Sequence, residues 1–338
     1  VHDAERDRVI VYGGYTYGST QSLETWALDL GAGVWSQIPA SGPPSMTGHS
    51  AIVDPVRDRM ILYRGTELWS LDLAGSPAWS LLATTGGTPP AHAGHSAVFD
   101  PVHDRMIVFG GDGTSDVWQL SFSGATPEWS LLPTTGVIPS PRFGHVAVYD
   151  SRRQRMVVFG NGDGAPRSSL LSLTLDQPSA ATWALIEATG PEHYPSGRVG
   201  IYAPVRGRIV FQGGGGPYED GLTSSLLLSG TPHWTTLSTA SQIIARSDHA
   251  GIYDAARDRM VVSGGAYHGG ATNYYASAHA LGFPASTSVD LDPAVTSSRI
   301  SAVVPNPARG SQAFMLGIAE GKPVSAIEVF SVTGQRIW

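Results

Sequence analysis

The twelve residues DPVHDRMIVFGG, at positions 100–111, decide the fold of this chain. An aspartate and a proline open the segment as they open tight turns, and the apolar run RMIVF follows as a strand covered on both faces would. The two glycines that end it permit positive φ angles and a close approach of other groups. We expect them to leave room for a tryptophan ring of the same repeat.

The phrase occurs six times along the chain. The other copies are DAERDRVIVYGG (3–14), DPVRDRMILYRG (54–65), DSRRQRMVVFGN (150–161), APVRGRIVFQGG (203–214) and DAARDRMVVSGG (254–265). The six copies start 51, 46, 50, 53 and 51 residues apart. A constant period near ~50 residues is typical of propeller repeats.

Each repeat predicts four strands and no helix. A short segment such as GHSAVFD (94–100) precedes the phrase, an alternating segment such as DVWQLSF (116–122) follows a variable loop, and a tryptophan segment such as EWSLLPT (128–134) ends the unit. A four-stranded sheet cannot bury both faces alone, whereas radial stacking buries them and leaves only short edges. The recurring tryptophans are Trp35, Trp79, Trp129, Trp183 and Trp234.

These motifs resemble the kelch repeat over residues 1–283. The resemblance implies an all-β kelch β-propeller with six blades, or seven if the coding sequence extends upstream. Copies four and five depart from the pattern, since Asn161 replaces the second glycine and Ile201 follows Gly200 where histidine is expected. The first unit lacks its GHSA strand and the sixth lacks its tryptophan strand, a place that STSVDL (286–291) is a candidate to fill.

Residues 284–298 read as a proline-bearing linker of small residues. The segments PNPARG (305–310) and IEVFSVTGQRI (327–337) resemble the start of the small Ig-like β-sandwich at the C-terminus of many secreted bacterial proteins, the FlgD-like and type IX secretion sorting tails. We therefore expect a partial Ig-like sorting domain at 299–338. The resemblance implies export through the secretion machinery and an extracellular or outer cell surface location.

Composition excludes several functions. The net charge is −7 and Lys322 is the only lysine, so a basic nucleic-acid surface is not expected. The chain has no cysteine, which removes disulfides, thiolate metal sites and the cysteine-dependent copper chemistry of galactose-oxidase-like propellers. No apolar run has the ~18 residues that a membrane span needs. We expect no cofactor and no metal site, and a monomer.

Residues that recur in every blade are interpreted as structural. The Asp-x-x-x-x-Arg pattern fits a turn followed by a strand start, and His49, His95 and His145 recur at the start of a strand, as packing residues would. Neither His92-x-x-His95 nor the glycine runs GNGDG (160–164) and GGGG (213–216) have the ligands or the following helix that a metal or phosphate site needs.

Function is expected where the blades differ, in the loops between second and third strands. In an antiparallel blade these loops share one face with the proline-rich links between blades, and Arg142, Arg198 and Arg246 precede the innermost strands there. Aromatic rings beside carboxylates and arginines suit sugar or peptide recognition. The candidate ligand-binding residues are Tyr15, Tyr17, Asp112, Asp116, Asp163, Arg167, Tyr218, Glu219, Asp220, Tyr267, His268 and Tyr274.

Three functions remain open from the sequence. The first is an exported, non-catalytic module that binds a glycan or a protein through the variable loops. The second is a carbohydrate-active enzyme that uses the central channel, although the sequence pairs no catalytic carboxylates. The third is a surface spacer or adhesin with no small ligand. We favour the first, and name no catalytic residue.

Overall fold

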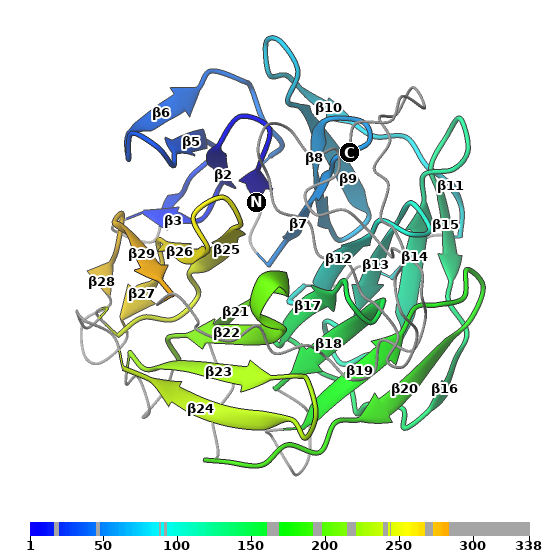
Figure 1. Ribbon diagram of the computed structural model, residues 1–338. Coiled ribbons are helices and arrows are strands. Elements are labelled where there is room, and N and C mark those ends of the chain that lie inside the picture. The colour runs from blue at the N-terminus through cyan, green and yellow to red at the C-terminus, as the bar shows by residue number, and fades with distance from the viewer. Residues whose placement is uncertain are drawn as a thin grey trace, which may run out of the picture. The chain divides into compact units, whose positions relative to one another are not determined.

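Six β-sheets stand around a common axis and form a six-bladed propeller (Figure 1). The computed structural model describes residues 1–16, 20–44, 48–87, 89–90, 93–160, 169–191, 198–214, 221–238, 243, 245–267 and 273–283. The expected all-β, six-bladed architecture is confirmed. The expected Ig-like region and the segment STSVDL (286–291) lie outside the described residues.

Blades 1 to 3 each contain four consecutive antiparallel strands. Blade 1 is β1 (His2–Asp3), β2 (Arg8–Tyr12), β5 (Thr25–Asp29) and β6 (Trp35–Ile38). Blade 2 is β7 (Ser50–Asp54), β8 (Arg59–Arg64), β9 (Glu67–Asp72) and β10 (Trp79–Leu81). Blade 3 is β12 (Ser96–Asp100), β13 (Arg105–Phe109), β14 (Val117–Ser121) and β15 (Glu128–Leu131).

Blades 4 and 5 repeat the pattern, and blade 6 shows three strands within the described residues. Blade 4 is β17 (Val146–Asp150), β18 (Arg155–Phe159), β19 (Leu170–Thr174) and β20 (Ala181–Leu185). Blade 5 is β21 (Val199–Ala203), β22 (Arg208–Gln212), β23 (Thr223–Leu227) and β24 (His233–Leu237). Blade 6 is β25 (Ala250–Asp254), β26 (Arg259–Ser263) and β29 (Ala278–Gly282).

The hydrophobic core is divided among the six junctions between blades. The second strand of each blade is largely buried, and all five residues of β13 are buried, as the apolar run RMIVF predicts. Each of the six apolar clusters joins two neighbouring blades, and β1 lies beside β25, so the ring closes between blade 6 and blade 1. The closing junction is built on Val9, Leu28, Leu30, Ile252 and Val261.

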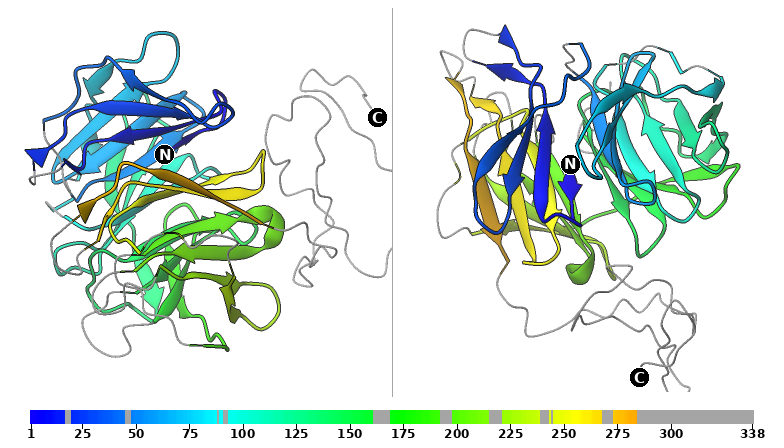
Figure 2. Two further views of the ribbon diagram at one scale, coloured as in Figure 1. Left: turned by 90° about the vertical axis from the view of Figure 1, so that its left-hand side faces the viewer. Right: turned by 90° about the horizontal axis from the view of Figure 1, so that it is seen from above.

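The turns between first and second strands lie at one end of the propeller, which we call the turn face. The 3-10 turn η1 (Pro204–Arg206) belongs to it and is drawn as the single green coil in Figure 2. The opposite end carries the loops between second and third strands and the links between blades, and we call it the loop face. This division follows from the antiparallel order of each sheet.

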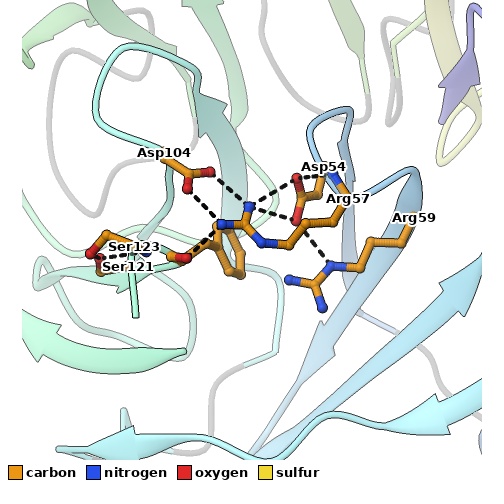
Figure 3. Close-up of polar contacts among 7 residues, drawn as sticks. Asp54, Arg57, Arg59, Asp104, Ser121 and Ser123 are labelled. Atoms are coloured by element: carbon orange, nitrogen blue, oxygen red, sulfur yellow. Dashed lines mark hydrogen bonds and ion pairs between the residues drawn. The ribbon is translucent and has the colours of Figure 1, made fainter. Parts of the chain in front are cut away.

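An arginine on the turn face reaches from one blade to the next. The guanidinium of Arg57 donates to both carboxylate oxygens of Asp104, at 2.9 and 2.7 Å, and contacts Asp54 at 3.3 Å (Figure 3). Asp54 is fully buried and also accepts from Arg59 Nε at 2.9 Å. The same link recurs as Arg6–Asp58, Arg206–Asp258 and, across the closing junction, Arg257–Asp7.

This arrangement confirms the structural interpretation of the Asp-x-x-x-x-Arg pattern. The accepting aspartate has a positive φ, 48° at both Asp58 and Asp104, which aspartate adopts more readily than most residues. The two remaining junctions use other contacts because Gln154 and Gly207 stand in the aspartate position. There Arg105 donates to the carbonyls of residues 175, 177 and 178, and Arg152 donates to that of Val205.

Candidate binding surface

The glycine pairs of blades 3 and 5 bring each of these blades into contact with the link that enters the next one. Gly111 N–H donates to the carbonyl of Arg142 at 2.8 Å, and a Cβ at Gly110 would lie 2.7 Å from that carbonyl oxygen. Gly213 and Gly214 meet the carbonyl of Arg246 in the same way. The expectation that the glycines leave room for a tryptophan of the same blade is therefore wrong, because the space is taken by the next link.

The tryptophans instead pack on an aromatic residue near the end of the second strand of the previous blade. Trp129 lies 5.1 Å from Tyr63, and Trp183 lies 4.8 Å from Phe109, measured between ring centroids. The histidine of the following blade contacts the same ring, as His145 contacts Phe109 at 5.0 Å. Each such junction holds an aromatic residue of one blade against a histidine and a tryptophan of the next.

The histidines are framework residues, as the repeat predicts. His145 is 8% exposed and its Nε2 forms a 2.7 Å hydrogen bond with Ser96 Oγ of the preceding blade. His95 contacts Ser50 Oγ at 2.8 Å in the same way, and His49 lies beside the Tyr12 ring. Burial, with a smaller contribution from the charge of Arg142, lowers the pKa of His145 to about 3, so its imidazole is neutral at physiological pH.

The arginines of the loop face are also engaged by the framework. Arg142 is 2% exposed and donates to the carbonyl of Gly160 at 3.3 Å and to Ser169 Oγ at 3.2 Å. Arg246 is fully buried, donates to the carbonyl of Gly264 at 3.0 Å, and lies 4.7 Å from the centre of the Tyr275 ring. Burial lowers the pKa of both guanidinium groups. They hold the loops in place and do not present charge to a ligand.

Arg198, and not Ile201 as the sequence suggested, occupies the position at which blades 2, 3, 4 and 6 carry their histidine, directly before the innermost strand. It is 8% exposed, and its guanidinium donates to Ser224 Oγ at 3.3 Å. The drift seen in the sequence of blade 5 thus replaces one buried framework side chain by another.

Asp112 and Asp116 have different places in the loop of blade 3. Asp112 Oδ2 accepts the backbone N–H of Ala93 at 2.7 Å, and its own N–H donates to the carbonyl of Ala93, so this carboxylate fixes the neighbouring link. Asp116 is exposed, and its carbonyl accepts from Gly110 N–H. The carboxylate of Asp116 is therefore more available to a ligand than that of Asp112.

Two neighbouring blades extend their loops into small hairpins on the loop face. In blade 1, β3 (Tyr15–Thr16) pairs with β4 (Thr20–Gln21), and in blade 6, β27 (Ala266–Tyr267) pairs with β28 (Asn273–Tyr274). In the second hairpin Tyr274 pairs with Ala266 and Tyr267 pairs with Asn273, and Tyr267 is half-buried. Because blades 1 and 6 meet at the closing junction, the two hairpins stand on adjacent sheets (Figure 1).

The remaining candidates lie outside the described residues. They are Tyr17, Asp163, Arg167, Tyr218, Glu219, Asp220 and His268. In the part of the chain that the structure describes, no group of three or more metal-ligating side chains comes together. No helix among the described residues is long and apolar enough to cross a membrane.

Sequence reasoning missed an exposed aromatic residue on the loop face. Phe143 lies in the link before blade 4 and is 56% exposed. Pattern reasoning passed over Phe143 because it lies between Arg142 and His145, which belong to the framework. The signal available was that Ala93 and Ser247 occupy the equivalent place in blades 3 and 6, so this position varies while its neighbours recur.

A second missed feature is a Thr-Gly pair that clamps the outer strand of the next blade. Thr85–Gly86 (β11) and Thr134–Gly136 (β16) pair in parallel with β15 and β20, and Thr189 bridges to His233 of β24. A Cβ at Gly136 would lie 2.1 Å from the carbonyl oxygen of Trp183. The recurrence of TTG (84–86 and 134–136) and ATG (188–190) after the tryptophan strands of blades 2, 3 and 4 was the available signal.

A family model and one solved structure agree with this architecture. A family model described as the KLHDC2/KLHL20/DRC7 Kelch-repeats domain matches residues 2–118 and 66–265. A solved structure described as "Structure of YjhT" superposes with a TM-score of 0.57 at 16% identity, covering 71% of this chain and 82% of that one. A second, described as a cryo-EM structure of RAG with one melted and one unmelted RSS, gives a TM-score of 0.49 at 14% identity, with coverages of 70% and 82%. No curated protein matches the sequence.

Proposed function

Because the chain belongs to the Kelch-repeat family of KLHDC2, KLHL20 and DRC7, we propose that it is a non-catalytic binding module that recognises a glycan or a protein through its loop face. Kelch propellers generally act as binding modules. A rigid ring that presents variable loops at one end is a common way to build such a site.

One observation carries the proposal. The repeated charged groups of the loop face are used inside the framework, while the aromatic residues vary from blade to blade and Phe143 is left exposed. The guanidinium groups of Arg142 and Arg246 are engaged by the framework. The exposed ring of Phe143 and the half-buried ring of Tyr267 therefore favour a neutral ligand, such as a sugar ring or an uncharged peptide segment, over an anion.

The proposal includes export, with the secretion machinery as a partner and an extracellular or outer cell surface location. It rests only on the resemblance of residues 305–310 and 327–337 to sorting tails. Detection of the full-length protein outside the cells that make it, and its retention inside after deletion of residues 299–338, would support this part.

Binding is tested with the full chain on a glycan array and on a peptide array. Tyr267→Ala and Phe143→Ala should each weaken binding at least tenfold without changing the melting temperature. Val56→Ala is the matched control, since Val56 is 69% exposed on the turn face. Binding that survives both loop-face substitutions, or absence of binding on both arrays, contradicts the proposal.

A further inference from the structure

The junction between blades 5 and 6 has a glutamine where four other junctions have an aromatic ring. The tenth residue of the repeated phrase is aromatic in blades 1 to 4, where it is Tyr12, Tyr63, Phe109 and Phe159. In blade 5 this residue is Gln212, which ends β22 and is completely buried. The buried amide is independent of the exposed residues on which the proposed function rests.

Two further polar side chains lie beside Gln212. Thr223 is its direct partner in the antiparallel pair of β22 and β23, so the two side chains stand on the same face of the blade. Val210 stands on this face too, in the apolar cluster that joins blade 5 to blade 6. The ring of His249, from blade 6, lies 2.5 Å from the position that a Cβ at Gly213 would take. Gln212, Thr223 and His249, which are 0, 2 and 8% exposed, thus meet inside the junction.

Among the described residues, five polar atoms of these three side chains have no hydrogen-bond partner. They are Gln212 Oε1 and Nε2, Thr223 Oγ1, and both ring nitrogens of His249. Folded proteins pair nearly all buried polar atoms with protein groups or with ordered water, because an unpaired one is destabilising. The cluster therefore calls for a partner.

The cluster offers both donors and acceptors of hydrogen bonds. Gln212 has an amide N–H and a carbonyl oxygen, and the hydroxyl of Thr223 can do either. Burial, with a smaller contribution from the charge of Arg246, lowers the pKa of His249 to about 3. The backbone of Gln212, which lies near the ring without forming a hydrogen bond, opposes this shift only in small part. The imidazole is therefore neutral, with one donor and one acceptor nitrogen.

The junction between blades 1 and 2 shows how the equivalent threonine is satisfied by the protein. Thr25 lies opposite Tyr12 as Thr223 lies opposite Gln212. Its hydroxyl accepts the indole N–H of Trp79 at 2.9 Å. In that junction a side chain of the next blade completes the polar group, so the interior holds no unpaired hydroxyl at Thr25.

The histidine at the junction of blades 5 and 6 has also exchanged its polar neighbour for an apolar one. His145 bonds Ser96 Oγ at 2.7 Å, but the residue of blade 5 that corresponds to Ser96 is Val199. Val199 lies opposite Gln212 on the inner side, and Leu237 lies opposite Thr223 on the outer side. Neither side chain can form a hydrogen bond with the cluster.

We propose that this junction binds a structural water molecule, hydrogen-bonded to the side chains of Gln212, Thr223 and His249. The three groups are uncharged, which favours a neutral molecule over an ion. A water molecule donates and accepts, as this set of atoms requires, and buried waters typically form about three hydrogen bonds to otherwise unpaired groups. The water takes the part that an aromatic ring and an indole N–H have between blades 1 and 2.

The experiment is NMR on the full chain with labelled threonine methyl groups. Cross-relaxation between water protons and the Thr223 methyl should have the sign of a water molecule that tumbles with the protein. Thr25 is the matched control, since it is equally buried but its hydroxyl is paired with Trp79. A signal relayed through an exchanging hydroxyl proton would appear at both threonines. The signal at Thr223 should therefore exceed that at Thr25 severalfold.

A substitution gives a test by the direction of its effect. Thr223→Val keeps the shape of the side chain and removes one hydrogen bond to the water, so the equilibrium constant of unfolding should rise about fivefold. If the hydroxyl were unpaired, the same change would remove a destabilising group and the constant would fall. Thr25→Val, which breaks the bond to Trp79, is the reference and should raise the constant by a similar factor.

Three results would overturn the proposal. The first is equal cross-relaxation with water at the methyl groups of Thr223 and Thr25. The second is an unfolding constant that is unchanged or lowered by Thr223→Val. The third is a nuclear Overhauser contact between the Gln212 amide protons and a polar side chain from outside the described residues, which would identify a protein group as the partner.

Discussion

Replacement of Arg57 by alanine tests whether the arginine links of the turn face hold neighbouring blades together. The substitution removes two charge-assisted hydrogen bonds to Asp104, at 2.9 and 2.7 Å, and one to the carbonyl of Phe122 at 2.5 Å. It also removes a guanidinium that lies 5.4 Å from the centre of the Phe122 ring. Asp54 remains paired with Arg59, so no buried carboxylate is left without a partner.

The expected loss is about 2 kcal/mol of unfolding free energy. Hydrogen bonds to charged groups contribute about 1.5–3 kcal/mol each when buried, but Arg57 and Asp104 are 31% and 30% exposed, which reduces the contribution of the ion pair toward ~1 kcal/mol. For a domain of this size the loss corresponds to roughly 5 °C in melting temperature. Urea unfolding followed by tryptophan fluorescence measures it.

A double-mutant cycle and a pH series separate this link from general damage. The cycle with Asp104→Ala should give a coupling of about 1 kcal/mol. The hydrogen bond from Arg57 lowers the pKa of Asp104, so its stabilisation is present above the unfolded value of 3.8 and is lost as pH falls through the lower folded value. The difference between wild type and Arg57→Ala should therefore narrow below pH 4. A difference under about 0.5 kcal/mol at pH 7, similar to that of the exposed Glu5→Ala control, would refute the reasoning.

Three further outcomes are expected. Gly136→Ala should lower the free energy of unfolding by at least about 3 kcal/mol in chemical unfolding, since its Cβ would lie 2.1 Å from a carbonyl oxygen. Gly113→Ala is the control, because Gly113 has a similar φ but open space around it, and should cost about 1–2 kcal/mol. Equal losses would contradict the clamp. Trp129→Ala should cost about 3–5 kcal/mol by calorimetry, because it uncovers Tyr63 at a buried junction. Burial lowers the pKa of the His145 imidazole to about 3, so this group should show no NMR titration between pH 8 and 5. Because the folded protein keeps the imidazole neutral, the protein should lose stability as pH falls below the unfolded pKa of about 6.5. A titration midpoint near 6.5 would contradict the burial of His145.

The sequence was sufficient for the blades because each strand is specified locally. The continuous apolar run at Arg105–Phe109 and the tryptophan of Glu128–Leu131 predict a buried second strand and an outer strand without knowledge of their neighbours. Periodicity also sorted framework from function correctly for His145, which is buried against the preceding blade.

Contacts between blades could not be predicted in the same way. Nothing in the phrase around Arg57 says that its partner is the aspartate of the next copy, because that pairing depends on the rotation between sheets. The contact of the glycine pair was predicted wrongly for the same reason. Its neighbour is the link that enters the next blade and not a ring of its own blade. At the candidate site, Asp112 was chosen for its charge, but that charge is engaged by the backbone of Ala93, a contact that pattern alone does not reveal.

The arginine links also bear on how such a chain can grow. An arginine link needs a donor arginine in one blade and an acceptor aspartate in the next. Blade 2 carries both, because Asp58 accepts from Arg6 of blade 1 and Arg57 donates to Asp104 of blade 3. A tandem duplication of blade 2 would therefore bring compatible partners on both sides at once. A duplication of blade 4 would not, because Gln154 offers no carboxylate to an incoming arginine. The pattern of arginine links therefore distinguishes blades whose copies would match their neighbours from blades whose copies would lack a partner at the junction.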